Sequence, residues 1–251
     1  MIAKLLAILI LTIGSPIAAQ TTTAPDGNAI LLMAREAQGG DGWANAKTLQ
    51  LSGHAVFYGS NGPEPRSTAD DYRMWRIFDP DREVAHGAAG KVRISAKSKG
   101  RILFDIGFDG NISWNERGIV PKAEADLFWA NNFGFGIIRQ AGKPGFSAIR
   151  LPDDSRDGHA LYMVELTDPN AGKTLFGIDQ TTNAIRYMGF TTARGWHERL
   201  YDDFIRLSNP DWLQARRVTL YYDGRKTNEV FWDVAIVDAS VDEQLFTPPN
   251  F

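Results

Sequence analysis

The stretch KVRISAKSKGRILFDIGF, residues 91–108, contains the pattern that decides the fold class. Apolar residues occupy every second position in both of its halves: Val92, Ile94 and Ala96, then Ile102, Phe104, Ile106 and Phe108. Such alternation gives a strand one apolar face toward a core and one polar face toward water. Ser98-Lys99-Gly100 separates the halves and is typical of a tight turn. The stretch therefore predicts two antiparallel strands joined by a hairpin.

The same two-residue period continues through most of the chain, interrupted by further turn signals. These are Ser60-Asn61-Gly62, Asp109-Gly110, Asp157-Gly158, Asp168-Pro169-Asn170 and Asp223-Gly224. The runs between the turns predict about eleven or twelve strands, in a mainly β fold of the α+β class. Because a twisted sheet of that size must close or curl, we expect a curved antiparallel barrel with a concave apolar interior.

Two segments show helical spacing instead. The first follows a cap at Asp26 or Asn28 and stops at Gly39-Gly40, with apolar residues at Ile30, Met33, Ala34 and Ala37. The second starts near Pro121 and ends at Gly134 and Gly136, with Ala123, Leu127 and Ala130 on one side. Helices placed between strands can cover the open side of a curved sheet, and we expect these two to do so.

The N-terminus predicts export from the cytoplasm. A positive start at Lys4 is followed by an apolar run, Leu5–Ile13, and by the small residues Ile17-Ala18-Ala19. This pattern predicts a cleaved signal peptide over residues 1–19 and a periplasmic location, a membrane-anchored N-terminus being the alternative. A flexible leader over 20–27 and a single domain over 28–251 would follow. With no cysteine in the chain, neither a lipoprotein anchor nor a disulfide is expected.

The sequence indicates neither a metal site, nor a cofactor site, nor a nucleic-acid site. The four histidines lie far apart and form no ligand pair: His54, His86, His159 and His197. DDSRDG, residues 153–158, imitates a calcium loop, but Val164 stands where that loop needs a bidentate glutamate. The formal net charge of −3 and the lack of a basic stripe argue against a nucleic-acid partner.

The aromatic content is the most informative part of the composition. The chain has fourteen phenylalanines and seven tryptophans, several of them in FWANNFGFG, residues 128–136. Most of these rings would fill a core, but some could line a cavity for an apolar ligand. Val230–Val237 favours the second interpretation, because apolar residues fall on both faces of that predicted strand.

The stretch GWHERLYDDF, residues 195–204, concentrates polar side chains and could belong to an active site. His197, Arg199, Tyr201 and Asp203 would lie on one face of a strand. That face has the character of a solvated or cross-strand surface, so we interpret the stretch as a barrel strand and predict no catalytic residue. An enzyme centred on His197 remains a minor alternative.

Several motifs in order resemble the periplasmic LolA/LolB/LppX-type lipoprotein and lipid carriers. After the signal peptide and first helix come GGDGWANAKTLQLSG (39–53), FDGNISWNERG (108–118), FGIDQTTNAIRYM (176–188), LYDDFIRL (200–207) and VDASVDEQLFTPPNF (237–251). The resemblance implies a curved, unclosed antiparallel barrel whose concave face is covered by helices and holds acyl chains. LolA proper carries Arg-Pro-Gly in an early strand, whereas this chain reads YRMWRIFDP (72–80). The chain therefore resembles a relative of these carriers, not LolA itself.

The expected function is a soluble periplasmic protein that binds and carries, or senses, a lipid or other hydrophobic ligand. The predicted cavity wall comprises Phe104, Phe108, Trp114, Trp129, Phe133, Phe135 and Trp232, and the candidate polar contacts are Arg73, Arg76 and His197. A membrane-bound donor or acceptor protein is an expected partner. The alternative is an envelope assembly module that binds partners through exposed strand edges.

Overall fold

The computed structural model describes residues 24–59 and 63–249, so the expected signal peptide and the first half of the expected leader, residues 20–23, lie outside the described residues. Their main feature is one antiparallel sheet of 13 strands. The strands are β1 (Thr48–Tyr58), β2 (Pro65–Ile77), β3 (Lys91–Ser98), β4 (Arg101–Phe108), β5 (Ser113–Asn115), β6 (Gly118–Ile119), β7 (Ser147–Arg156), β8 (His159–Thr167), β9 (Lys173–Asp179), β10 (Ile185–Thr192), β11 (Gly195–Ser208), β12 (Asp211–Tyr222) and β13 (Arg225–Val237).

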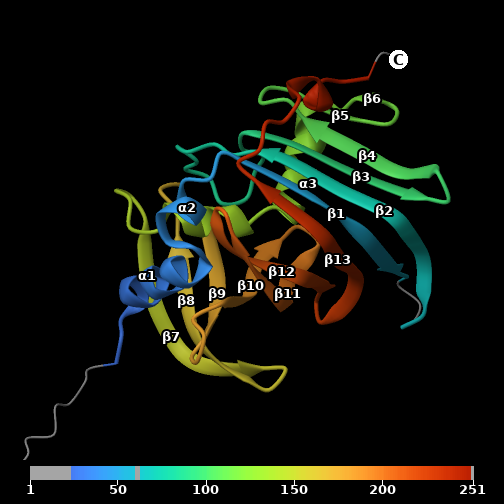
Figure 1. Cartoon of the computed structure of the whole chain (residues 1–251). Helices are drawn as coiled ribbons and strands as arrows, with labels where there is room; N and C mark the ends of the chain where they lie inside the picture. The colour runs from blue at the N-terminus through green and yellow to red at the C-terminus, as the bar shows by residue number, and fades with distance from the viewer. Residues whose placement is uncertain (1–23, 60–62, 250–251) are drawn as a thin grey trace, which may run out of the picture.

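The sheet consists of two meanders joined where the first strand pairs with the last. Its order runs from β6 through β1, then β13 back to β7, and β1 pairs with β13 in antiparallel register. The two end strands, β6 and β7, do not pair with each other within the described part of the chain. The sheet curls around a concave side and remains unclosed (Figure 1). This large unclosed antiparallel sheet agrees with the predicted architecture. The number of strands exceeds the predicted eleven or twelve. The additional strands include β5 and β6, which have three and two residues and are too short to show alternation.

Hairpin turns form where glycine follows a polar residue. Both central residues have positive φ at Lys99-Gly100, at Asp157-Gly158 and at Asp223-Gly224. Such turns suit the twist of the strands that they join, because positive φ at both positions matches the right-handed twist. DDSRDG therefore ends in the β7–β8 hairpin turn.

A bulge in β13 explains the apolar residues on both of its faces. Gly53 of β1 pairs with Trp232, but the preceding residue, Ser52, pairs with Val234. Asp233 of β13 is therefore skipped, and the register shifts at this point. Trp232 is consequently buried, whereas Val234 is 47% exposed on the outer face. A Cβ at Gly53 would lie 1.8 Å from the Phe231 carbonyl oxygen, so only glycine permits this approach.

Two consecutive helices, α1 (Gly27–Gln38) and α2 (Gly40–Ala44), precede the sheet. Asp26 caps α1 by accepting a hydrogen bond from the Ala29 N–H, and Gly39 ends the helix with φ 131°. The chain then forms α2, which sequence analysis did not predict. α1 packs beside β7–β9 and β12, and α2 packs beside β12 (Figure 1).

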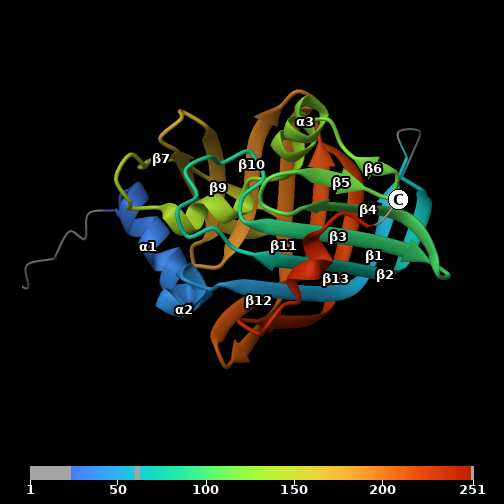
Figure 2. The same ribbon diagram turned by 90° about the horizontal axis from the view of Figure 1, so that it is seen from above.

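The connection between the two edges of the sheet is also helical. It consists of α3 (Lys122–Asn132) and the 3₁₀ helix η1 (Phe135–Gln140), which link β6 to β7. Gly134 lies between them and Gly136 lies within η1, so the helical segment extends beyond its predicted end. Figure 2 shows α3 above the concave side, between β5–β6 and β10–β11. In the described part of the chain, no helix is both long and apolar enough to cross a membrane.

The C-terminal segment returns to the sheet and packs through the 3₁₀ helix η2 (Glu243–Phe246). Phe246 is fully buried, and its carbonyl oxygen accepts a hydrogen bond of 2.6 Å from Trp114 Nε1. Trp114 pairs with Gly107 on β4, and the preceding residue of that strand, Ile106, faces the concave side. Side chains alternate between faces, so Trp114 and η2 lie on the opposite, outer face.

Candidate functional site

The concave side of the sheet contains an apolar cavity of about 540 Å³. Strands from both meanders, together with α3 and η1, form its wall. The apolar lining includes Leu49, Leu51, Phe57, Tyr72, Met74, Phe104, Phe133, Phe135, Tyr201, Phe204, Trp212, Val218, Leu220, Val230 and Trp232. Ligand pockets are commonly about 300–1,000 Å³, so the volume suits a small molecule. We call this space the apolar cavity.

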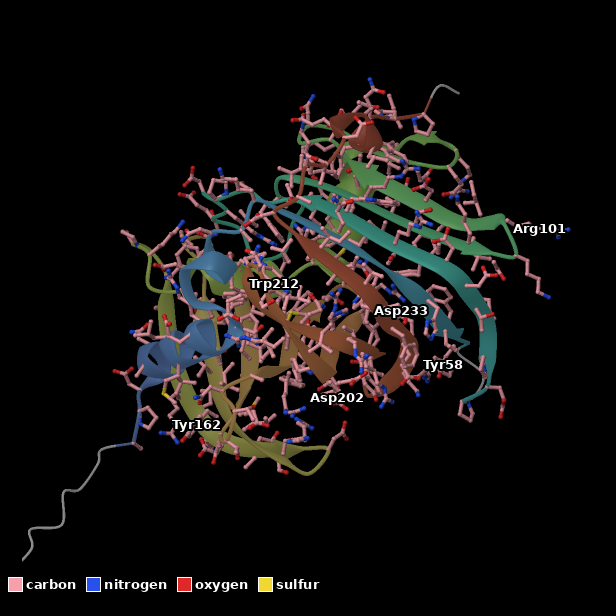
Figure 3. All side chains as sticks on the ribbon, in the orientation of Figure 1. Tyr58, Arg101, Tyr162, Asp202, Trp212 and Asp233 are labelled. Carbon is pink, nitrogen blue, oxygen red and sulfur yellow. The ribbon has the colours of Figure 1, made fainter. Side chains whose placement is uncertain are left out.

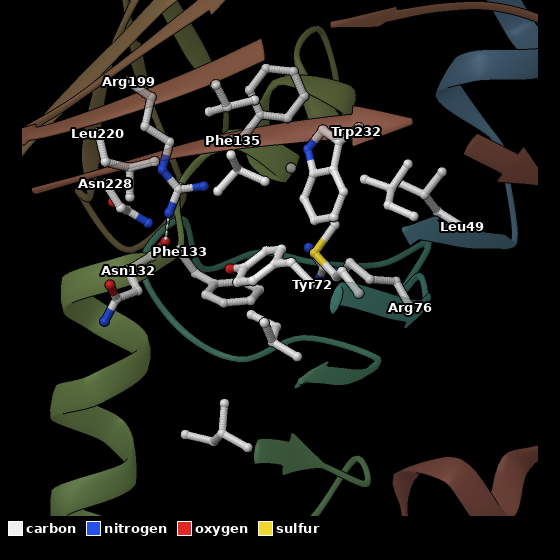
Figure 4. Close-up of a pocket in the computed structure, with 18 of the residues that line it drawn as sticks. Leu49, Tyr72, Arg76, Asn132, Phe133, Phe135, Arg199, Leu220, Asn228 and Trp232 are labelled. Carbon is white, nitrogen blue, oxygen red and sulfur yellow. Dashed lines mark hydrogen bonds between the residues drawn. The ribbon is translucent and has the colours of Figure 1, made fainter. Parts of the chain in front are cut away.

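Four of the predicted wall residues line this cavity. Phe104 comes from β4, Trp232 from β13, and Phe133 and Phe135 flank the turn between α3 and η1. Figure 4 shows Phe133, Phe135 and Trp232 converging from these separate elements around Tyr72. Tyr72 packs on Trp232, with ring centroids 5.3 Å apart.

The other three predicted wall residues do not line the apolar cavity. Phe108 and Trp129 pack against each other, with ring centroids 6.3 Å apart, where α3 meets the sheet. Trp129 also donates a hydrogen bond of 2.7 Å to Ser113 Oγ. Trp114 lies on the outer face beneath η2 and is fully buried there. These rings therefore fix α3 and the C-terminal segment to the sheet.

Several wall residues were not predicted. Tyr72 and Met74 alternate with Arg73 and Trp75, a signal that was present in the sequence. Trp212 begins β12 and packs near Trp43 of α2, at a centroid distance of 6.5 Å. Figure 3 shows Trp212 near α2 inside the molecule, whereas Arg101 projects from the β3–β4 hairpin.

The two arginine candidates in β2 point in opposite directions. Arg73 is exposed on the outer face, and its Nε lies 2.6 Å from Asp71 Oδ1, so it is not a cavity contact. Arg76 lines the apolar cavity and is only 8% exposed. Burial first, and then neighbouring guanidinium groups such as that of Arg82, lower the pKa of Arg76 to about 9. Arg76 is therefore still charged at neutral pH.

Arg139 of η1 is a second buried cation, which was not among the predicted site residues. It is 9% exposed and lies over the rings of Trp43, Phe78 and Trp212, with Cζ 3.9 Å from the Phe78 centroid. Burial lowers its pKa to about 9, so this guanidinium is also charged at neutral pH. FGFGIIRQ gives no periodic signal that would have indicated a buried arginine.

A second cavity, of about 790 Å³, lies between α1, α2, η1 and the segment after β2. We call it the polar cavity, because eight charged side chains line it. Most of them are cationic: Arg35, Lys47, Arg76, Arg82, Arg139 and Lys143, against Asp79 and Asp81. It shares Arg76, Phe78, Gly136 and Arg139 with the apolar cavity. The two buried arginines therefore stand at the boundary between an apolar and a polar space.

His197 lies inside the molecule, whereas the sequence predicted a solvated or cross-strand surface for its face of the strand. It is fully buried between Phe190 and Tyr222, and its Nε2 accepts a hydrogen bond of 3.0 Å from Arg199 Nε. Burial first, and then Arg199, lower the pKa of His197 to about 2. The imidazole is therefore neutral, and its lone pair is already occupied. His197 does not line either cavity.

The remaining residues of this stretch do not assemble into a catalytic group. Tyr201 lines the apolar cavity, whereas Asp203 lies on the outside, where its carboxylate pairs with Arg216 at 2.7 Å. A positive φ of 49° at Asp203 changes the side of the strand that faces inward, so Phe204 also lines the cavity. This turn of the backbone explains why neither face of the stretch was uniformly apolar.

Metal-binding side chains do not gather in the described residues. No group of three or more histidine, aspartate or glutamate side chains is arranged there to hold an ion. The polar side chains that reach the apolar cavity include four arginines, whose guanidinium groups cannot coordinate metals, and only two carboxylates, those of Glu116 and Glu124.

These features define a class: an unclosed antiparallel half-barrel that encloses an apolar cavity beneath helical connections. No protein-family model and no curated protein sequence matches the chain. The chain is similar to solved structures in fold. One of them is a domain of an outer membrane lipoprotein-sorting protein from Vibrio parahaemolyticus, with 13% identity and a TM-score of 0.53, over 88% of this chain and 95% of that one.

Two further solved structures share the arrangement. One is a LolA superfamily protein from Nitrosomonas europaea, with 15% identity and a TM-score of 0.52, over 89% of this chain and 98% of that one. The other is a DUF1329 family protein from Desulfovibrio piger, with 8% identity and a TM-score of 0.54, over 88% and 95%. The chain therefore has a LolA-like fold.

Proposed function

We propose that this protein binds and carries a lipid or other hydrophobic ligand in the apolar cavity, in the periplasm after removal of residues 1–19. The observation that carries the proposal is the cavity of about 540 Å³, lined mainly by aromatic and aliphatic side chains on the concave side of the sheet. The LolA-like fold supports the same class of function.

Burial of apolar surface would supply most of the affinity. Removing apolar area from water stabilises by about 25 cal/mol per Å², or about 0.8 kcal/mol for each methylene group. An acyl chain in this cavity could therefore bind tightly by burial alone. Tight binding implies slow dissociation, so release would require movement of α3 and η1 or a partner that competes for the ligand. A membrane-bound donor or acceptor would fill that role.

The sheet edges give less support to an assembly module. β6 offers only two residues, and the exposed part of β7 carries Pro152 and the charged side chains of Asp153, Asp154 and Arg156. Proline and charged side chains are the usual means by which natural edge strands avoid pairing with other chains. The carrier function is accordingly the one we propose.

Quenching of tryptophan fluorescence tests the carrier function directly. Trp43, Trp212 and Trp232 line the apolar cavity, whereas Trp75 lies on β2 between the inward-facing Met74 and Arg76. A stearyl alcohol brominated at mid-chain should quench the wild-type fluorescence saturably, because bromine quenches an indole only at contact range. Unbrominated stearyl alcohol is the control ligand.

Substitution locates the quenched rings. In Trp232→Phe the quenched fraction of the emission should fall, because a ring in the cavity wall has been removed. Trp75→Phe is the matched control and should leave the quenched emission unchanged. Absence of saturable quenching, or an equal effect of the two substitutions, would contradict binding in the apolar cavity.

A further inference from the structure

The two buried arginines at the boundary of the cavities lack the partners that buried charges normally have. Arg76 and Arg139 form no ion pair with a carboxylate of the described residues. A charge removed from water is strongly destabilising unless it is paired and hydrogen-bonded. Asp238, the carboxylate that most affects Arg139, already accepts hydrogen bonds from the backbone of Lys47 and Thr48.

Their donor atoms are also unused. Arg76 Nε, Arg139 Nε and Arg139 Nη1 are buried and have no hydrogen-bond partner within the described chain. Among the described residues, Arg76 donates a single long hydrogen bond, 3.4 Å from Nη2 to the Ala89 carbonyl oxygen. Arg82 provides an internal comparison: it is equally buried, but its guanidinium donates to the carbonyl oxygens of Val84, Ala85 and Gly87. Arg82 is therefore satisfied by the fold itself, whereas Arg76 and Arg139 are not.

The two guanidinium groups are held close together at one place. Both stack on Phe78, with Cζ atoms 5.3 Å (Arg76) and 3.9 Å (Arg139) from the ring centroid. Both line the apolar cavity on one side and the polar cavity on the other. Figure 4 shows Arg76 at the edge of the apolar lining, beyond Tyr72. Positively charged donors between an apolar and a cationic space match an amphiphile with an anionic group.

We propose that the ligand is an anionic amphiphile whose carboxylate or phosphate oxygens are bound between Arg76 and Arg139. This inference rests on the proposed function and specifies its ligand class. The acyl chain would occupy the apolar cavity, and any further polar part of the head group would enter the polar cavity. Guanidinium groups bind carboxylate and phosphate oxygens through paired N–H donors, so the unused donors would be satisfied on binding.

The test compares ligands that share one chain and differ in the head group. Oleyl alcohol, oleate and oleyl phosphate are titrated by calorimetry against the full mature protein, below their micellar concentrations. The wild type should bind both anions at least tenfold more tightly than the alcohol. The ratio between oleate and oleyl phosphate identifies which head group is preferred. Inorganic phosphate alone is the fourth titrant and should bind at least tenfold more weakly than oleyl phosphate.

Three variants assign the preference to residues. Arg76→Met and Arg139→Met retain volume and aromatic contact but remove the charge, so the anion preference should fall to about threefold or less while alcohol binding is retained. Arg73→Met is the control from the same strand and should keep the wild-type preference, since Arg73 lies outside and pairs with Asp71. The melting temperatures of the unliganded Arg76 and Arg139 variants should not fall, because an unpaired buried charge has been removed.

The possible failures are distinguishable. Equal binding of the alcohol and both anions by the wild type would overturn the head-group inference and leave the carrier function intact. If the Arg76 and Arg139 variants lose affinity equally for all three ligands and have lowered melting temperatures, the arginines have a structural role, and the head-group inference is overturned. Phosphate bound as tightly as oleyl phosphate would replace it with a small-anion site. Binding of none of the three lipids would overturn the proposed function and this inference with it.

Discussion

Asp179 holds the turn between β9 and β10 through several hydrogen bonds to one carboxylate. Its Oδ1 accepts from the backbone N–H groups of Thr181 and Thr182, and its Oδ2 accepts from Arg186 Nε at 2.6 Å. Burial raises the pKa of Asp179, but these hydrogen bonds outweigh burial and lower the pKa to about 2. The ionised carboxylate is therefore part of the folded structure.

Acid titration should expose this contribution to stability. An unfolded aspartate has a pKa of about 3.9, so the lowered folded value stabilises the protein fully above about pH 4. That stability is lost as the pH falls through the folded pKa of about 2. Asp179→Asn should therefore be less stable than the wild type at neutral pH and less sensitive to pH between about 4 and 2. Urea midpoints at each pH measure this, and parallel curves for the two proteins would contradict it.

Single residues were predictable where their role is local. Asp26 as a helix cap and Gly39 as a helix end depend only on neighbouring backbone groups, and both are found in the structure. The boundary arginine Arg139 was not predictable, because its burial results from contacts with rings on α2, β12 and the segment after β2. Residues brought together by long-range packing leave no periodic signal in the sequence.

The helix α3 is attached to the sheet at its C-terminal end by side chains of β11 and β12. Arg199 donates to the Asn132 carbonyl oxygen, and the Tyr222 hydroxyl donates to the Asn131 carbonyl oxygen at 2.5 Å. The last carbonyl groups of a helix lack partners within the helix and carry partial negative charge, so a guanidinium is favoured there. Arg199 therefore helps to hold the helical connection over the apolar cavity (Figure 4).

Removing this attachment should loosen the helix. Arg199→Met deletes a charged hydrogen bond of about 1.5–3 kcal/mol, so amide hydrogen exchange in α3 should be about tenfold faster or more. Hydrogen-exchange mass spectrometry of peptides covering Lys122–Asn132 measures this. The control is Arg216→Met, from the outer side of β12, where Arg216 pairs with Asp203. Similar protection of α3 in both variants would show that Arg199 does not hold the helix.

The strands could be predicted as elements, but the face of the sheet to which each side chain points could be predicted only in part. Alternation located β3 and β4 and the hairpin between them with nearly correct bounds. The inward face changes along β13 at the bulge beside Gly53, and along β11 at Asp203. Each irregularity depends on the partner strand or on one unusual φ angle. A fixed two-residue period therefore assigned residues beyond these points to the wrong face.

At the scale of the whole molecule, one continuous sheet brings distant segments of the chain around one interior. The first and last strands pair, and α3 and η1 connect the two free edges. The LolA-like fold recurs in structures that share only 8–15% of residues with this chain. Very different sequences can therefore form this sheet. The alternation predicted the curved antiparallel sheet, whereas the volume of its interior depends on how strands from both meanders converge.

The lipid content of the purified protein is the most direct test of the carrier account. Val218 faces the apolar cavity from β12, so Val218→Trp should place a large ring in it and obstruct the ligand, whereas Val234→Trp adds the same ring on the outer face of β13. Each protein is purified from the periplasm without detergent, extracted with organic solvent and analysed by lipid mass spectrometry. The account predicts acyl-chain lipid with the wild type and with Val234→Trp, and at least tenfold less with Val218→Trp. A lipid-free wild type, or equal lipid in all three proteins, would contradict it.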